Sequence, residues 1–247
     1  MSIPKERPAV TPAESKRVYN RDAKDFAAVA PTLLWWEALG KPTYKLRLQE
    51  ICNPSTRLLD LGTASARVPI FLCETFGVQP SNVTGIEISP EQVAIARQRL
   101  PGADIRCGDI TDLTLDIPIG AYDLATSNMV FEFLDPPGLE RALVLAHRSL
   151  KTGGNLFFIT THPEKMRMDS GLTEPGPFTI AFPWGGSGPN FFRTTEDFAE
   201  ALQKAGFVID STEGLKIPPE ARSLDPEKFD AFVKYPFIRL GVFAHKP

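Results

Sequence analysis

The sequence predicts an α/β fold built on a mostly parallel β-sheet that helices cover on both faces. Short β-rich apolar runs alternate with segments of helical periodicity along most of the chain, an order typical of parallel strands joined by helices. The first predicted strand also contains a carboxylate, Asp60, near its end and is followed by a loop of small residues, Gly62 to Ala66. Because small residues let a ligand lie against the backbone, this loop indicates a nucleotide or nucleoside site.

The length and composition are those of one globular domain, expected over residues 18–247. Of the 247 residues, 43% are hydrophobic and 23% are charged, which allows one well-buried core and argues against general disorder. The net charge is −3, and basic residues are dispersed among acidic ones. A nucleic-acid-binding protein usually carries a clustered basic face, so nucleic acid is disfavoured as the substrate.

Metal, disulfide and membrane sites are not indicated by the sequence. The three cysteines are isolated and lack the paired spacing of zinc ligands, and only three histidines are present. No apolar run approaches the length of a membrane span, and the N-terminal residues lack the hydrophobic core of a signal peptide. We therefore expect a cytoplasmic protein with no metal and no membrane partner.

The N-terminal region predicts a helical cover over the rest of the fold. Residues 1–17, with three prolines and mixed charges, are expected to form a mobile tail. Within residues 18–52, Phe26, Val29 and Leu33 recur at spacings of three and four, which places them on one helical face. Prolines divide this region into short helices.

The first strand is predicted over residues 57–61 and the following helix over 66–76. Pro69 is tolerable because it falls in the first turn of that helix, where the backbone lacks an intrahelical partner. Gly77 is placed to cap the end of the helix. This part of the sequence therefore predicts a strand, a loop and a helix in direct succession.

Ser89 marks the start of the next helix, which is predicted to run to Leu100. A second strand over residues 83–88 leads into Ser89-Pro90-Glu91-Gln92, in which serine is the N-cap, proline is the first helical residue and glutamine lies three residues on. The same alternation continues to the end of the chain, with strands predicted over 104–107, 122–127, 156–161, 207–211 and 239–245 and with helices after the fourth strand and from Thr194.

Residues 163–193 interrupt this alternation. They are rich in proline, glycine and aromatic residues and have no clear period. Because a loop of this length inside a compact domain usually has a function, we expect an insertion that covers the substrate.

Polar residues follow four of the predicted strands. Asp60 ends the first strand, Glu87 ends the second, and Asp109 and Asn128 follow the third and fourth. In an open parallel sheet these strand ends line one crevice. A carboxylate after the second strand can accept both hydrogen bonds of a ribose diol, and Asp109 can accept one from an exocyclic amine. A nucleoside with a short polar tail fits this set of side chains.

With these residues in place, the chain resembles a class I S-adenosylmethionine-dependent methyltransferase of the small-molecule type. The family's loop reads D-x-G-x-G-x-G, and Asp60 to Ala66 match it with alanine at the second and third glycines; the resemblance is close over residues 55–162 and looser over 194–247. It implies a Rossmann-like, doubly wound, seven-stranded sheet whose last strand is antiparallel. Alanine disfavours positive φ, so the loop either takes ordinary dihedral angles at the alanines or is strained.

The resemblance also implies which residues hold the cofactor, S-adenosyl-L-methionine. Glu87 would hold the ribose hydroxyls beside Ile88, and Asn128 would meet the methionine amino group through its backbone. The implied cofactor-binding residues are Tyr19, Asp60, Gly62, Thr63, Ala64, Glu87, Ile88, Asp109, Ile110 and Asn128.

Two residues are candidates for catalysis on the acceptor side. His162, after the fifth strand, titrates near neutrality and could act as a general base, although it could instead be a structural histidine ahead of Pro163. Glu132 could bind a cationic or hydroxylated acceptor or be a helix N-terminal charge. Aromatic residues suit an apolar or planar small molecule, and the candidates for substrate binding are Trp35, Trp36, Phe131, Trp184 and Phe192.

The sequence leaves alternatives to methyl transfer onto a small, apolar or aromatic metabolite. The alanines in the loop admit a non-catalytic cofactor-binding or scaffold protein with the same fold. A nicotinamide dehydrogenase is disfavoured because the glycine spacing does not match G-x-G-x-x-G. A nucleic-acid base methyltransferase is disfavoured because Ser127-Asn128-Met129-Val130 differs from the N/D-P-P-Y type of motif. A homodimer is possible on the sequence alone.

Overall fold

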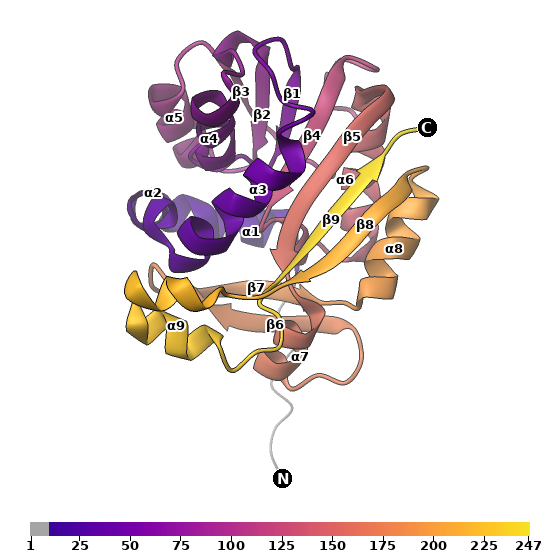
Figure 1. Ribbon diagram of the computed structural model, residues 1–247. Coiled ribbons are helices and arrows are strands. Elements are labelled where there is room, and N and C mark those ends of the chain that lie inside the picture. Colours follow the sequence, from indigo (N-terminus) through magenta and orange to yellow (C-terminus); the bar gives the residue numbers. More distant parts are fainter. Residues whose placement is uncertain (1–9) are drawn as a thin grey trace.

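A seven-stranded sheet forms the centre of the molecule (Figure 1). The computed structural model describes residues 10–247. The strands lie in the order β3-β2-β1-β4-β5-β9-β8, in which β9 is antiparallel to both its neighbours and the pairs from β3 to β5 are parallel. The predicted α/β fold with an antiparallel last strand is confirmed. The strands are β1 (Leu58–Leu61), β2 (Val83–Glu87), β3 (Asp104–Cys107), β4 (Tyr122–Asn128), β5 (Leu150–Thr161), β8 (Val208–Leu215) and β9 (Arg239–His245).

Helices bury both faces of the sheet. Leu58 packs in a core shared with α3, α4 and α5, whereas Leu59 and Leu61 pack in a second core with α6 and α8, as expected because side chains alternate along a strand. None of the helices within residues 10–247 combines the length and apolar character needed to cross a bilayer. These helices are α3 (Lys41–Leu48), α4 (Arg67–Phe76), α5 (Pro90–Arg99), α6 (Pro136–Ser149) and α8 (Thr195–Lys204).

The helix ends that the sequence predicts are present in the structure. The Ser89 hydroxyl accepts a hydrogen bond from the backbone N–H of Gln92 at 3.2 Å, and Gly77 ends α4 at a φ of +73°. Thr194 and Asp197 form a complete capping box at the start of α8. Local capping chemistry therefore sets where these helices begin and end.

The N-terminal cover begins earlier than the sequence analysis predicts. Residues 1–9 of the expected tail lie outside the described residues, but helix α1 (Pro12–Arg21) starts within the range 1–17. Its N-cap is Thr11, whose hydroxyl accepts from the Glu14 backbone N–H at 3.2 Å. Residues 12–17 of the expected tail are therefore helical, and the boundary of the tail at residue 17 stays a prediction. The cover continues through α2 (Ala23–Val29), a π-helix (Trp36–Gly40) and α3.

The insertion at 163–193 has secondary structure that the sequence pattern does not reveal. It contains helix α7 (Pro163–Ser170) and an antiparallel hairpin of β6 (Gly176–Ala181) and β7 (Ser187–Phe192), and the later segment contains α9 (Pro226–Phe232). In Figure 1 the hairpin, α9 and the N-terminal helices gather at the edge where the parallel strands end. These three segments enclose that edge of the sheet.

Candidate active site

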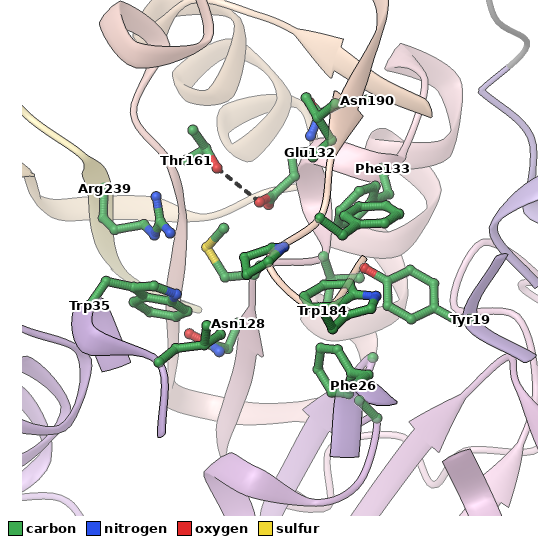
Figure 2. Close-up of a pocket in the computed structure, with 18 of the residues that line it drawn as sticks. Tyr19, Phe26, Trp35, Asn128, Glu132, Phe133, Thr161, Trp184, Asn190 and Arg239 are labelled. Atoms are coloured by element: carbon green, nitrogen blue, oxygen red, sulfur yellow. Dashed lines mark hydrogen bonds between the residues drawn. The ribbon is translucent and has the colours of Figure 1, made fainter. Parts of the chain in front are cut away.

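A cavity of about 640 Å³ lies at the carboxyl ends of the parallel strands. Its walls come from the loop after β1, the ends of β2, β3 and β4, the N-terminal helices and the β6–β7 hairpin. Figure 2 shows part of the lining, with aromatic residues at one side and polar residues near Arg239 and Glu132. Of the side chains predicted from sequence, the cavity brings together Tyr19, Trp35, Gly62, Ala64, Glu87, Ile88, Asp109, Ile110, Asn128, Glu132 and Trp184.

The small-residue loop approaches the cavity in a strained conformation. Gly62 has a φ of +73°, and a Cβ there would lie 2.4 Å from Val130 Cγ2, so only glycine fits. Ala64 and Ala66 have φ values of +46° and +65°, which cost an L-residue roughly 1–2 kcal/mol each. Of the two possibilities left by the sequence, ordinary dihedral angles or strain, the structure shows strain.

Glu87 holds this loop in place from the end of β2. Its Oε2 accepts from the Ala64 backbone N–H and its Oε1 from the Ser89 backbone N–H, both at 2.9 Å. Burial raises the pKa of the Glu87 carboxyl, although both amide hydrogen bonds favour its ionised form. Because each carboxylate oxygen has a second lone pair, Glu87 can support the loop and still accept hydrogen bonds from a ligand.

Asp109 and Asn128 are polar residues that line the cavity together with Glu87. Asp109 Oδ1 accepts from the Thr111 backbone N–H at 2.8 Å, which fixes the turn after β3. The Asn128 side-chain oxygen is buried and has no hydrogen-bond partner among the described residues. A buried acceptor of this kind indicates that a donor is missing.

Asp60 and Thr63 lie behind the loop and do not line the cavity. Asp60 Oδ1 accepts from the Thr126 hydroxyl at 2.6 Å, and the Thr63 methyl group packs against Gly85, where a Cβ would come within 2.8 Å of it. Burial raises the pKa of Asp60 to about 6. These positions point to support of the loop from beneath, so direct ligand contact by Asp60 and Thr63 stays a prediction.

We expect the ionisation of Asp60 to destabilise the folded protein, so that the free energy of unfolding falls as pH rises. Since the pKa of Asp60 in the folded protein, about 6, lies above its ordinary value of 3.8, the stability it contributes is present below pH 4 and is lost as pH rises through 6. The free energy of unfolding of Asp60→Asn, taken relative to wild type, should therefore be about 2–3 kcal/mol higher at pH 7.5 than at pH 4. Urea unfolding across this range measures the difference, with the exposed Asp116→Asn as the control. A pH-independent difference would contradict the assignment.

Glu132 is the candidate catalytic residue that reaches the cavity. It lies in the short helix Phe131–Phe133, is fully buried, and accepts from the hydroxyls of Thr160 at 2.6 Å and Thr161 at 3.1 Å (Figure 2). Burial raises the pKa of Glu132. A carboxyl group with a raised pKa inside a cavity is a common arrangement for proton transfer.

His162 is placed differently from the sequence prediction. The cavity does not reach it; instead it is the N-cap of α7, where Nδ1 accepts from the Glu164 backbone N–H at 3.1 Å, and its ring packs 4.8 Å from that of Phe237. Burial lowers its pKa. This geometry corresponds to the structural interpretation of His162, and it gives no support to a role as base.

We therefore expect His162→Ala to change stability and leave methyl transfer unaffected. Loss of the N-cap should lower the free energy of unfolding by about 1 kcal/mol, whereas His162→Asn, which can cap, should retain it. Urea unfolding and turnover measured on the same preparations test this. A large loss of turnover in both variants would restore His162 as the base.

An aromatic cluster closes one side of the cavity. The rings of Phe182 and Trp184 stack at 4.7 Å, Phe26 meets Trp184 edge-on at 4.8 Å, and Tyr19 lies 5.6 Å from Phe133. These side chains come from α1, α2, the helix after β4 and the hairpin, and Figure 2 shows four of them on the same side of the cavity: Tyr19, Phe26, Phe133 and Trp184. Segments far apart in sequence thus form one apolar wall.

Three of the predicted substrate-binding aromatics lie outside the cavity lining. Trp36 packs edge-on against Tyr44 at 5.8 Å, and Phe131 packs against Phe158 at 5.0 Å. Phe192 belongs to a small cluster under the hairpin. These rings are buried in the protein core, and the structure gives no support to contact between them and a substrate.

Basic residues also line the cavity, and the sequence gives no signal for them: Arg67, Lys165, Lys228, Lys234 and Arg239. Arg67 Nη1 donates to the Ala30 carbonyl at 2.7 Å, and its guanidinium lies 5.1 Å from the centre of the Trp35 ring. Arg239, at the start of β9, lies 4.4 Å from the same ring. No spacing signal marks either arginine, because the helices and the last strand meet only in the folded chain. Among the described residues, no group of three or more potential ligands is arranged to bind a metal.

Comparisons with known proteins agree with this geometry. Residues 58–154 match the family model described as a methyltransferase domain. Over 123 residues the chain is 31% identical to an arsenite methyltransferase of Aquipseudomonas alcaligenes, a match covering 46% of this chain and 35% of that protein. It is 27% identical over 220 residues to a ubiquinone biosynthesis O-methyltransferase of Xylella fastidiosa, covering 83% and 85% of the two chains.

A solved structure extends the similarity to most of the chain. An S-adenosylmethionine-dependent methyltransferase from Mesorhizobium loti superposes with a TM-score of 0.64 and 21% identity, covering 83% of this chain and 96% of that one. At this identity the comparison establishes the fold. The chain spans about a third of the length of the arsenite methyltransferase, so that protein's activity does not transfer to it directly.

Proposed function

Because the chain belongs to the class I S-adenosylmethionine-dependent methyltransferases, we propose that it transfers a methyl group from S-adenosylmethionine to a small acceptor with an apolar or aromatic body. The observation that carries the proposal is that both groups of residues line the same cavity. Glu87, Asp109 and Asn128 line one part of it, and the aromatic wall with Glu132 lines the other. The cofactor and the methyl acceptor can therefore lie side by side in one cavity.

The residues present fit the cofactor. The orphaned oxygen of Asn128 offers an acceptor to an ammonium group, and Gly62 lines the cavity with its backbone alone. Glu87 would bind the ribose hydroxyls, Asp109 would accept from the adenine amine, and Ile88 and Ile110 would flank the base. Hydrogen-bond acceptors and apolar surface thus lie where a nucleoside needs them.

The protein's contribution to methyl transfer is alignment and exclusion of water. When bound, S-adenosylmethionine would supply the methyl group of its sulfonium, which would pass in line to the acceptor as S-adenosylhomocysteine leaves. The aromatic wall holds the acceptor and keeps water from the reacting atoms. Glu132, held by two threonine hydroxyls, faces the acceptor part of the cavity and can take its proton.

Binding and label transfer together test this function. Calorimetry should find one S-adenosylmethionine per chain. Incubation with methyl-labelled S-adenosylmethionine and a small-molecule extract of the source cells should label a low-molecular-weight product, to be identified by mass spectrometry. Cofactor binding without transfer to any fraction would favour the scaffold alternative, and absence of binding would overturn the proposal altogether.

A further inference from the structure

The part of the cavity beside β9 contains a buried positive charge. Arg239 is 6% exposed and lines the cavity, and Figure 2 shows its side chain extending into the enclosed space near Glu132 and Thr161. Its Nη1 donates to the Ile238 carbonyl at 2.8 Å. Its Nε is buried and has no hydrogen-bond partner among the described residues. A buried guanidinium with a free donor is costly unless something pairs with it.

The carboxylates nearest in the cavity have other partners. Both oxygens of Glu132 accept from the threonine hydroxyls of β5. Asp169 pairs with Lys165 and accepts from the Tyr235 hydroxyl at 2.6 Å. Arg239 takes part in none of the ion pairs found within residues 10–247. Burial lowers the pKa of the Arg239 guanidinium to about 10, and the charge of Glu132, which is not hydrogen-bonded to it, opposes this shift.

The surroundings of Arg239 fix the orientation of its guanidinium, and its Nε has no hydrogen-bond partner in the part of the chain that the structure describes. Its guanidinium lies over Trp35, 4.4 Å from the ring centre, and Trp35 is itself 3% exposed. Stacking on a ring holds the guanidinium plane, and the Nη1 bond to Ile238 occupies one end of it. In arginine the Nε–H and one Nη–H lie parallel, an edge that matches the two oxygens of a carboxylate.

The position of Arg239 in the sheet places this edge on the acceptor side. The cofactor-binding residues follow β1, β2, β3 and β4, whereas Arg239 begins β9, which is separated from β4 by β5. Arg239 pairs in register with Thr161, whose hydroxyl donates to Glu132. An anion bound to Arg239 would therefore lie beside the candidate catalytic carboxyl group and away from the nucleoside.

We propose that the methyl acceptor is a carboxylic acid whose carboxylate binds the Nε edge of Arg239 and is not itself methylated. The inference rests on the proposed methyl transfer and specifies its substrate class: an apolar or aromatic acid with a second, nucleophilic group. A planar carboxylate offers two coplanar oxygens to the Nε–H of Arg239 and the Nη–H parallel to it. Since the carboxylate remains free, the product is still an acid.

The charge of the labelled product tests the inference. Wild-type protein is incubated with methyl-labelled S-adenosylmethionine and the small-molecule extract, and the products are separated by anion exchange at neutral pH. We expect the labelled product to be retained and to resist alkaline phosphatase. A labelled product that passes through the exchanger, or one whose retention phosphatase abolishes, overturns the carboxylate acceptor and leaves methyl transfer standing. No label in any fraction overturns methyl transfer itself.

Two arginine variants link the carboxylate to this residue. Arg239→Gln should lower the rate of labelling at low acceptor concentration by about 10- to 100-fold, with the calorimetric affinity for S-adenosylhomocysteine within about twofold of wild type. Arg193→Gln is the matched buried control, because both Arg193 Nη atoms donate to backbone carbonyls, of Phe131 and Leu134.

The two variants should differ in stability as well as in activity. Arg193→Gln should lower the melting temperature, whereas Arg239→Gln should keep the wild-type melting temperature, because the Arg239 substitution removes a charge that has no ion-pair partner among the described residues.

If Arg239→Gln fails to fold, Arg239→Lys keeps the charge without the paired donors and should raise the KM for the acceptor while sparing kcat. Unchanged acceptor KM in the folded variants would overturn the role of Arg239.

Discussion

Replacing Glu87 by alanine is expected to weaken S-adenosylmethionine binding by about 3 kcal/mol, on the order of 100-fold. The ribose would lose its acceptor, and the backbone N–H groups of Ala64 and Ser89 would lose the carboxylate oxygens that they contact at 2.9 Å. Because Ala64 is held at a φ of +46°, the loop would also lose the hydrogen bond that opposes its strain. Isothermal calorimetry measures the loss of affinity.

Two further variants make this result specific. Asp109→Ala should cost less, about 1–2 kcal/mol, since Asp109 supports one backbone donor, that of Thr111. Glu91→Ala, at an exposed position in the first turn of α5, should bind as wild type does. Wild-type affinity in both Glu87→Ala and Asp109→Ala would remove these residues from the cofactor site.

Replacing Glu132 by glutamine is expected to lower turnover by about 100-fold or more, the usual contribution of a general base. Glutamine keeps the size of the side chain and can still accept from one of the threonine hydroxyls, so the fold and the affinity for S-adenosylhomocysteine should be retained. Steady-state kinetics with the identified acceptor, together with calorimetry, separate the two effects. Turnover near the wild-type value would make Glu132 a structural carboxyl.

The pH profile distinguishes a base from a merely structural carboxyl. As a base, Glu132 must be ionised, so kcat should fall on the acidic side of its raised pKa. The hydroxyl of Thr161 lowers that pKa by donating to the carboxylate. Thr161→Val should therefore move the acidic limb of the profile to higher pH, whereas a structural role would leave the limb in place.

The sequence predicts the fold and the cofactor half well because their signals are local. Strand β3 and strand β9 lie where the apolar runs predict them, and the Ser89 and Gly77 caps set the helix ends. Glu87 and Asp109 each follow a strand directly, so the parallel sheet alone brings them to one edge. Their roles toward the cofactor stay predictions, although both line the cavity.

The acceptor half could not be predicted in the same way because it depends on contacts between distant segments. Trp184 meets Phe26 across about 160 residues of chain, and no periodicity in the insertion announces the hairpin that carries Trp184. Trp35 and Trp36 are adjacent residues of the same type, so the sequence cannot tell them apart. In the structure Trp35 lines the cavity, whereas Trp36 is buried in the core. His162 directly follows β5 but is used as the N-cap of α7.

The strained loop after β1 has a consequence for the kinetics of ligand exchange. Glu87 holds Ala64 by a hydrogen bond, and Ala66 is buried in its left-handed conformation. The loop from Gly62 to Ala66 is therefore ordered before a ligand binds, and binding costs little conformational entropy in this loop. The backbone around the nucleoside is therefore a rigid template. We expect the rates of ligand entry and departure to depend instead on helices α1 and α2 and the β6–β7 hairpin, which line the rest of the cavity.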